Sequence, residues 1–146
     1  MKVLKRKSGN LINRKARFEY SFIENLETGI VLTGEEIKAV RANKVNLTGS
    51  HVKIIGGEAF WIGGNISVIS EDQQRTRKLL LHKEEIERLI GKSIEKGLTI
   101  IPTRIYLKHG RAKLEIALSR GKKIQDKRKE IRNRDLNREA GRRIKY

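Results

Sequence analysis

The chain has 146 residues, and its 34 lysines and arginines outnumber 17 acidic residues, which gives a formal net charge of +17. This length suits a single domain with a modest core, and the absence of cysteine excludes a disulfide framework, thiol nucleophiles and cysteine-ligated zinc. The charge indicates an anionic partner, usually nucleic acid. No apolar run approaches the roughly 20 residues that span a bilayer, so we expect a cytoplasmic protein.

The chain opens with a basic arm, residues 1–12, that we expect to be flexible because serine, glycine and asparagine interrupt any period. The segment RFEYSFI alternates apolar and polar residues, which predicts a half-buried strand. A second apolar run, residues 29–32, leads into a short helix after Thr33, because Thr33 and Glu36 have the spacing of a capping box. We expect Glu27 to lie in the loop between these two runs.

The rest of the domain is predicted to be strands with one helix between them. Gly56 and Gly57 separate two short apolar runs, which is the signal of a two-residue hairpin. The run KEEIERLIGK predicts a helix, with Gly97 as its C-cap. Two long strands, residues 98–108 and 111–119, close the domain, and the single proline should sit at a bulge or an edge.

These elements predict a mainly β domain over residues 13–119. Short antiparallel strands with two or three small helices favour an OB-fold-like β-barrel, since closure removes exposed strand edges. A split α+β sandwich with an open antiparallel sheet is the alternative that the same pattern allows.

The chain ends in a basic tail, residues 120–146, with 12 basic and 4 acidic residues. Its apolar residues form no single stripe on a helical wheel, and isolated helices are marginal in water. We therefore expect the tail to be disordered in the free protein and to become helical on an anionic surface. A plain solubilising tail is the alternative.

The sequence contains no constellation typical of catalysis. Its three histidines fall in separate predicted elements, and neither glycine-rich phosphate-binding motif is present, so we expect no enzymatic activity, no metal and no cofactor. Three basic clusters, residues 14–17, 38–44 and 75–78, suit phosphate contacts instead. Because aromatic residues are few, we expect the shape of a folded RNA to be recognised more than single-stranded sequence.

Several motifs occur together from about Asn13 into the tail: NRKARFEY, VLTGEEIKAVRANKVNL, GEAFWIGGNIS, RTRKLLLHKEEIERLIGK, EKGLTIIP and GKKIQDKR. With them the chain resembles the SmpB family, which binds transfer-messenger RNA (tmRNA, or SsrA RNA). The resemblance implies an OB-like barrel on the tRNA-like domain of tmRNA, in place of an anticodon arm. It implies a role in trans-translation, the rescue of stalled ribosomes with tagging of the nascent peptide.

The resemblance also implies partners and sites. The tail would be helical in the empty mRNA channel near the decoding centre of the small ribosomal subunit, and elongation factor Tu would be an indirect partner through alanyl-tmRNA, with no membrane involved. The expected RNA-binding residues are Asn13, Arg14, Arg17, Glu27, Arg41, Lys44, Arg75, Arg77 and Lys78. The expected ribosome-engaging residues of the tail are Gly121, Lys122, Lys123, Asp126, Lys127 and Arg128.

Two other functions stay open at this point. A general RNA- or ribosome-associated basic protein would use the same barrel and bind many folded RNAs alike. A protein of the membrane surface would use the basic tail, although the tail lacks a bulky apolar face. The chain also departs from the family at Phe18, where a histidine is usual, and at Leu136, where an aromatic residue is frequent.

Overall fold

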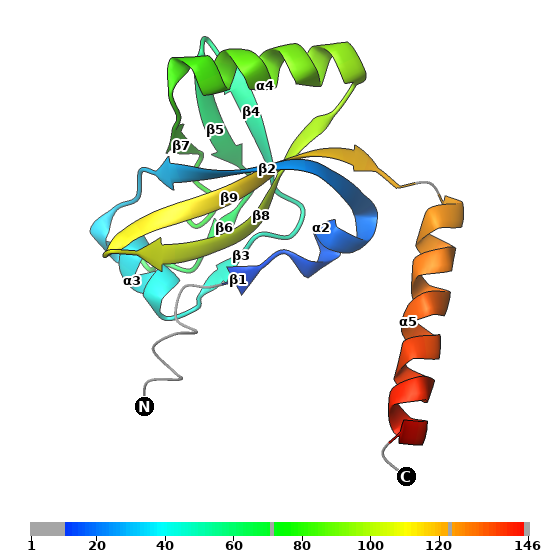
Figure 1. Ribbon diagram of the computed structural model, residues 1–146. Coiled ribbons are helices and arrows are strands. Elements are labelled where there is room, and N and C mark those ends of the chain that lie inside the picture. Colours follow the sequence, from blue (N-terminus) through cyan, green and yellow to red (C-terminus); the bar gives the residue numbers. More distant parts are fainter. Residues whose placement is uncertain (1–10, 71, 123, 145–146) are drawn as a thin grey trace.

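The structure is a computed structural model that describes residues 11–70, 72–122 and 124–144. Figure 1 shows that the strands lie together in one body and that the last helix lies apart from them. The elements are β1 (Leu11–Ile12), α2 (Arg14–Glu19), β2 (Tyr20–Ile30), α3 (Gly34–Arg41), β3 (Val45–Asn46), β4 (His51–Ile55), β5 (Glu58–Ile62), β6 (Asn65–Ile66), β7 (Arg77–Leu80), α4 (Lys83–Lys96), β8 (Thr99–Lys108), β9 (Arg111–Gly121) and α5 (Ile124–Ile144).

The main sheet closes on itself. Strands β8, β4, β5, β7, β2 and β9 pair in this order, β9 pairs again with β8, and every pairing is antiparallel. The closed ring confirms the predicted OB-like fold over the open sandwich, and it removes the exposed edges of an open sheet. The proline also lies where expected, because the register of β8 against β9 shifts between Pro102 and Arg104.

Local signals of the sequence account for several boundaries. Helix α3 begins with the predicted capping box, in which the Glu36 N–H donates to Thr33 Oγ1 at 3.2 Å and the Thr33 N–H donates to Glu36 Oε1 at 3.0 Å. Helix α4 ends at Gly97 in the left-handed conformation, with φ of 62°. Gly56 and Gly57, with φ of 60° and 77°, form the turn between β4 and β5.

The start of the domain differs from the prediction. Residues 14–19 form helix α2, and the strand begins only at Tyr20. The buried side chain of Asn13 caps this helix by accepting a hydrogen bond from the Ala16 N–H at 3.2 Å, and this local cap outweighs the alternation that includes Phe18. Strand β2 then continues to residue 30, so Glu27 lies within a strand and not in a loop.

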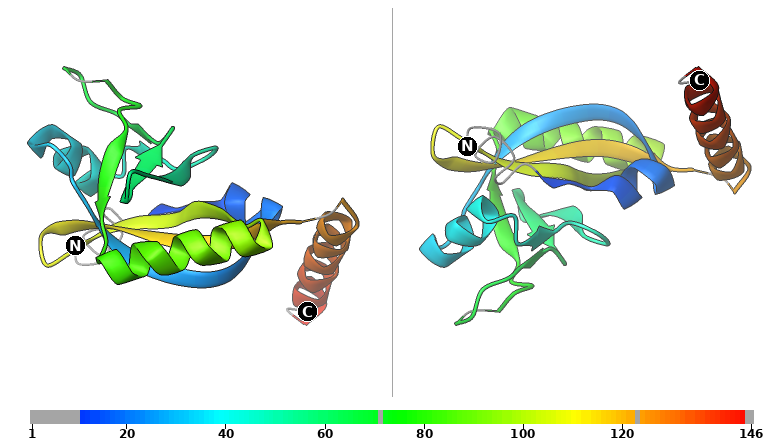
Figure 2. Two further views of the ribbon diagram at one scale, coloured as in Figure 1. Left: turned by 90° about the horizontal axis from the view of Figure 1, so that it is seen from above. Right: turned by 90° about the horizontal axis from the view of Figure 1, so that it is seen from below.

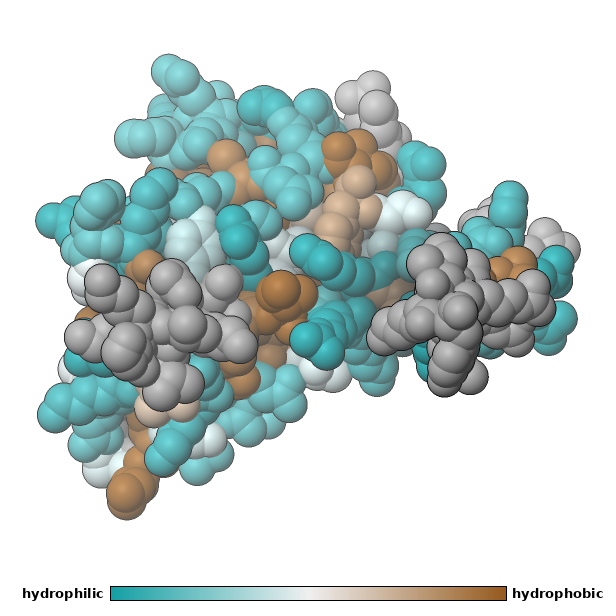
Figure 3. Space-filling view, turned by 60° about the horizontal axis from the view of Figure 1, so that its bottom comes forward, coloured by the Kyte–Doolittle hydropathy of each residue, from teal (hydrophilic) through white to brown (hydrophobic). Residues whose placement is uncertain are grey.

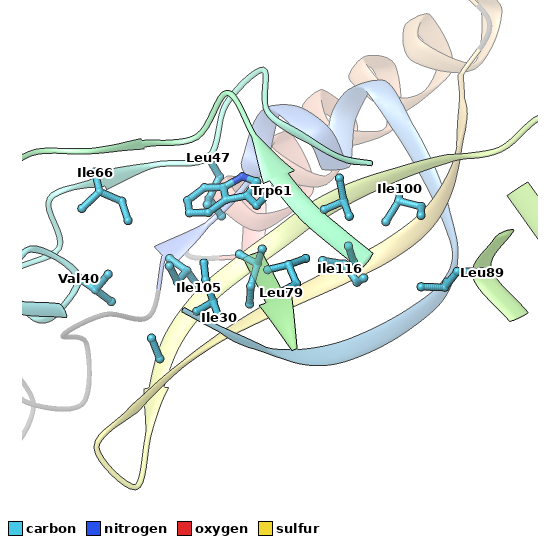
Figure 4. Packing of buried hydrophobic residues seen from close by; sticks show 14 of the residues in the cluster. Ile30, Val40, Leu47, Trp61, Ile66, Leu79, Leu89, Ile100, Ile105 and Ile116 are labelled. Carbon is cyan, nitrogen blue, oxygen red and sulfur yellow. The ribbon is translucent and has the colours of Figure 1, made fainter. Parts of the chain in front are cut away.

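The core lies inside the ring (Figure 4). Its largest side chain, Trp61, is 0% exposed, and the indole Nε1–H donates to Ser50 Oγ at 2.9 Å. Such a buried indole needs a hydrogen-bond acceptor, and Ser50 supplies it. Other residues without appreciable exposure are Val40, Ala59, Ile66, Ile105, Leu114, Ile116, Ala117 and Leu118.

Helix α4 covers one side of the ring, and α5 lies apart from it (Figure 2). The junction between β9 and α5 is attached to the start of the barrel. The backbone N–H of Lys122 donates to Glu19 O at 2.8 Å, and its ammonium donates to Arg17 O at 3.0 Å and contacts the Glu130 carboxylate. Farther along α5, the Arg134 guanidinium lies 5.7 Å from the ring centre of Phe18. None of the described helices is both long and apolar enough to cross a membrane.

Helix α5 corrects one part of the predicted fold. The sequence predicts a tail that is disordered without a partner, whereas the structure has 21 helical residues in the chain by itself. The helical wheel considers only apolar stripes, and exposed Ile131 and Leu136 indeed form none that is covered. The contacts of Lys122 and Arg134 supply another source of stabilisation, and the segment has no proline to interrupt the helix.

Candidate nucleic-acid interface

A groove runs between the N-terminal end of α4, strand β2 and the strands β5 and β7. It brings together Glu27 and Lys78, which lie far apart in the sequence. We call this the α4 groove; its lining residues are Glu27, Gly29, Gly57, Glu58, Lys78, Leu79, Leu80, Leu81, His82, Glu85, Ile86 and Lys113. Both the carboxylate and the ammonium therefore face one open surface that a folded ligand can reach.

Glu27 is held as an ionised acceptor in this groove. The hydrogen bond from the Tyr106 hydroxyl, helped by the charges of Lys108 and Lys113, outweighs desolvation and lowers the pKa of the Glu27 carboxyl. Lys108 Nζ lies 3.6 Å from Glu27 Oε1. Burial and the same contact with Glu27 raise the pKa of Tyr106 to about 12, so the phenol keeps its proton and remains the donor. An ionised carboxylate of this kind can accept from the amino group of a base.

Lys78 is the cation of the groove that the sequence predicted. Its side chain is 47% exposed, and its Nζ lies 3.5 Å from Glu58 Oε1. Exposed ion pairs contribute little free energy, so Lys78 can exchange the Glu58 carboxylate for a phosphate at low cost. Lys78 therefore fits its predicted role as an anion contact.

Two further residues of the groove were missed. Lys113 is half-buried beside Glu27, and Leu80 is an exposed large apolar side chain. Strand alternation could have found Leu80, because in β7 the buried residues are Arg77 and Leu79, and Lys78 and Leu80 point outward.

A second basic groove lies between α3 and the segment after β6, and we call it the α3 groove. Lys38 and Lys44 line it with Glu35, Ala39, Ala42, Ser67, Val68 and Ile69. Arg41 is exposed on the same helix, and the Ser67 N–H donates to Lys44 O at 3.0 Å, which ties the two walls together. The predicted cluster at residues 38–44 therefore forms one wall of an open basic surface.

Helix α3 also carries a buried carboxylate, Glu36, which binds two arginines. The side chains of Glu36 and Arg77 are 0% exposed, and that of Arg75 is 37% exposed. Arg75 Nη2 donates to Glu36 Oε1 at 2.6 Å, and Arg77 Nε donates to Oε2 at 2.8 Å. Burial raises the pKa of Glu36, but the hydrogen bonds from Arg75, the Thr33 N–H and Arg77 outweigh it and hold the pKa below its ordinary value.

The side chain of Arg77 is buried, and its guanidinium binds other groups of the interior. Its Nη1 donates to Gly64 O at 2.9 Å, its Nη2 donates to Gln73 O at 2.9 Å, and its guanidinium lies 5.2 Å from the ring centre of Trp61. Because Arg77 has no exposed surface, the structure corrects its assignment as an RNA contact. Its hydrogen bonds hold the segment between β6 and β7 in place.

Asn13 is corrected in the same way. It is 3% exposed, and its side-chain amide donates to Pro102 O at 2.9 Å in addition to capping α2. Its role is to fasten the start of helix α2 to β8. Arg14 and Arg17, on the helix that Asn13 caps, are exposed and remain available to an anionic partner.

The predicted tail residues divide into three groups. Gly121 is the last residue of β9, and the side chain of Lys122 is engaged by Arg17 O and Glu130. Asp126, Lys127 and Arg128 lie in the first turns of α5, where the side chain of Arg128 is exposed. Lys123 lies outside the described residues.

Basic residues line two of the described grooves, Lys78 and Lys113 in the α4 groove and Lys38 and Lys44 in the α3 groove. On the side of the molecule shown in Figure 3, hydrophilic residues surround several patches of hydrophobic ones. Among residues 11–70, 72–122 and 124–144, no cluster of three or more His, Cys, Asp or Glu side chains could hold a metal ion. The surfaces described above are therefore suited to binding an extended polyanion at several separate points.

Comparisons with known proteins agree with this description. A model of the family described as "SmpB protein" matches residues 10–146. An SsrA-binding protein of Thermosynechococcus vestitus is 46% identical over 140 residues, which is 91% of this chain and 92% of the relative. An SsrA-binding protein of Persephonella marina is 49% identical over 139 residues, with 91% of each chain covered.

A solved structure is also similar. It is described as "tmRNA-SmpB: a journey to the center of the bacterial ribosome", and one of its chains superposes on this chain with a TM-score of 0.68. The two chains share 44% sequence identity, and the match covers 80% of this chain and 86% of the other.

Proposed function

The chain belongs to the SmpB family, and we propose on that premise that it binds the tRNA-like domain of tmRNA and works with it in trans-translation. In this process a stalled ribosome is rescued and the nascent peptide is tagged for degradation. Relatives over most of the chain are named for binding SsrA RNA, and the similar solved structure is described as tmRNA with SmpB in the ribosome. The proposed role is binding, without catalysis, in the cytoplasm.

The α4 groove is the observation that supports this function best. The ionised Glu27, with Lys113 beside it, lines the same open groove as Lys78. Lysines there can neutralise backbone phosphates, and the carboxylate can accept from a base amino group, which a nonspecific polycation does not do. Leu80 adds an apolar surface at the same place. The groove thus combines affinity for phosphate with a means of selecting a particular RNA.

The tail is proposed to act at a different partner. We assign helix α5, with Asp126, Lys127 and Arg128, to the empty mRNA channel near the decoding centre of the small ribosomal subunit. The charge of residues 120–146 supports binding to ribosomal RNA. Elongation factor Tu would take part only indirectly, through alanyl-tmRNA.

The first experiment is a gel-shift titration with the tRNA-like domain of tmRNA and an elongator tRNA, at about 50 and 200 mM salt, a range over which purely electrostatic binding weakens by orders of magnitude. We expect only the tmRNA fragment to remain bound at the higher salt. If both RNAs are lost together, the chain is a general RNA-binding protein and the proposed function is wrong.

Single substitutions locate the binding surface. Glu27→Gln should weaken binding of the tmRNA fragment roughly tenfold, as expected for loss of a specific contact to a base. Lys78→Ala should lower the salt dependence by about one phosphate contact. Lys53→Ala is the control, because Lys53 is an exposed lysine on β4 outside both basic grooves. If Lys53→Ala weakens binding as much as Lys78→Ala does, the α4 groove is not the binding site.

The tail is tested separately. Replacing Asp126, Lys127 and Arg128 together with alanine should leave binding of the tmRNA fragment within about twofold, because the α4 groove is untouched, and should abolish peptide tagging on stalled ribosomes in a reconstituted system. Normal tagging by this variant would contradict the proposed role of the tail while leaving that of the barrel intact.

A further inference from the structure

Two carboxylates lie opposite each other on neighbouring strands of the barrel. Glu27 on β2 and Glu115 on β9 are partners in the register, and like charges directly opposite each other destabilise a sheet. Arg104 Nε donates to Glu115 Oε2 at 3.2 Å. Glu115 Oε1 accepts from the Thr103 hydroxyl at 3.1 Å and from the Asn25 amide at 3.4 Å. The charge of Glu115 is therefore balanced within the barrel, whereas Glu27 lines the open α4 groove.

The side chain of Tyr106 connects the two carboxylates. Its hydroxyl donates to Glu27 Oε2, and the Arg104 guanidinium lies 4.7 Å from the centre of its ring. A guanidinium in this position is attracted by the ring, and Arg104 is itself held by Glu115. Glu27 is thus fixed by a chain of contacts that begins at Glu115 and passes through Arg104 and the ring of Tyr106.

Glu27 can still accept hydrogen bonds from a ligand. A carboxylate has two oxygens with about four acceptor positions, and the Tyr106 hydroxyl occupies one of them. Lys108 Nζ lies 3.6 Å from Glu27 Oε1, but the side chain of Lys108 is 53% exposed, and an exposed ion pair contributes little free energy. Glu27 lines the α4 groove, whereas Tyr106 and Lys108 do not. Glu27 can therefore keep its contact with Tyr106 while it accepts from a base amino group in the groove.

Tyr106 affects Glu27 more than the charged groups around it do. The other ionisable side chains of the α4 groove are Glu58, Lys78, His82, Glu85 and Lys113. Lys78 pairs with Glu58, and Glu85 accepts from the backbone N–H of His82 at 2.9 Å. Lys108 and Lys113 lower the pKa of Glu27 through their charges, but by less than the hydrogen bond from Tyr106 does. A hydrogen bond is also directional, so this contact orients the carboxylate as well as favouring its charge.

We infer that Tyr106 is a positioning residue for RNA recognition: its hydroxyl, on a ring that Arg104 holds, fixes the carboxylate of Glu27 in the α4 groove as an acceptor for the amino group of an RNA base. This inference rests on the proposed function, because it assigns a role to a residue that acts through the RNA contact of Glu27. A carboxylate that is already ordered loses less conformational entropy on binding than a mobile one does.

The test uses the full chain and the tRNA-like domain of tmRNA. Tyr106→Phe removes the hydroxyl and keeps the ring beside Arg104, so it should weaken binding by about fivefold, the cost of immobilising one side chain. Tyr20→Phe is the matched control, because Tyr20 is a half-buried tyrosine at the start of β2 that lines neither basic groove. It should change binding by less than about twofold. Binding by Tyr106→Phe equal to that of the unchanged chain would overturn the inference.

A double-mutant cycle shows whether Tyr106 acts through Glu27. In the Glu27→Ala chain, which lacks the carboxylate, Tyr106→Phe should weaken binding further by less than about twofold. All variants are compared at a temperature where melting curves show them folded. An equal loss with and without the carboxylate would mean that the hydroxyl contacts RNA itself or supports only the fold, and would overturn the inference.

The pKa of Glu27 is a readout that a purely structural role of Tyr106 would not move. Because the hydrogen bond from Tyr106 lowers this pKa more than any other contact does, the Glu27 carboxyl of the free chain should titrate at a higher pH in Tyr106→Phe than in the unchanged chain. Nuclear magnetic resonance of the carboxyl carbon measures this pKa, and Tyr20→Phe should leave it unchanged. An unchanged pKa in Tyr106→Phe would overturn the inference even if RNA binding were weaker.

Failure of the inference is distinguishable from failure of the proposed function. If the unchanged chain does not prefer the tmRNA fragment over elongator tRNA at about 200 mM salt, both are wrong. If the unchanged chain keeps that preference and Tyr106→Phe does too, with equal affinity, only the positioning role of Tyr106 is wrong.

Discussion

Replacing Gly64 with alanine should destabilise the barrel strongly. A Cβ atom at Gly64 would lie 1.9 Å from Cζ2 and 2.1 Å from Cε2 of Trp61, well inside van der Waals contact. The indole cannot move aside easily, because its Nε1–H is bound to Ser50 Oγ and Arg77 lies over its ring. Overpacking costs about 1–3 kcal/mol, occasionally more, and loss of the indole hydrogen bond adds about 1 kcal/mol.

We therefore expect Gly64→Ala to lower the free energy of unfolding by about 3 kcal/mol and the melting temperature by roughly 10 °C, from the scaling for chains of this size. Urea and thermal unfolding would be followed by circular dichroism and by the emission of Trp61, the single tryptophan of the chain. The matched control is Gly91→Ala in the middle of α4, where a Cβ would meet nothing within 4 Å; alanine there should stabilise the helix by about 1 kcal/mol. Unchanged stability and emission of Gly64→Ala would refute the close packing described for Trp61.

Two further predictions concern Glu36 and the tail. Because the pKa of Glu36 is lowered in the folded chain from its ordinary value of 4.5, the ionised carboxylate adds stability above that pH, which is lost as the pH falls through the lowered pKa. The free energy of unfolding, measured with urea, should therefore decrease more below pH 4.5 for the unchanged chain than for Glu36→Gln. Equal decreases for the two chains would contradict this assignment. Truncation after Arg120 should remove the helical circular dichroism signal of α5, which has 21 residues; an unchanged signal would show that the tail is not helical in the free chain.

Local signals explain which parts of the fold could be predicted. The hairpin at Gly56 and Gly57, the capping box at Thr33 and the bulge at Pro102 each depend on a few neighbouring residues and a known backbone requirement. Helix α2 was missed because its capping residue, Asn13, is itself held by Pro102 O, 89 positions away in the sequence. No pattern within residues 14–19 reports that contact.

The candidate site shows the same limit. The motif RTRK predicts basic residues at a surface, but it does not tell which side chains of β7 point inward. That distinction depends on Glu36, whose buried carboxylate engages Arg77 from a helix far back in the chain. The sequence therefore predicted correctly that residues 75–78 reach a surface, but it assigned both Arg77 and Lys78 as RNA contacts. Of these two residues, only Lys78 lines the α4 groove.

The attachment of α5 to the barrel fixes how far from the barrel the side chains of this helix lie. Because the backbone of Lys122 is hydrogen-bonded to Glu19, the helix starts from a fixed point on the barrel, and its 21 residues form a rod of about 30 Å. Inserting one residue within the rod would advance its far end by about 1.5 Å and rotate every later side chain by roughly 100° about the axis. The number of residues in this segment therefore determines both the distance of each basic side chain from the barrel and the direction in which it points.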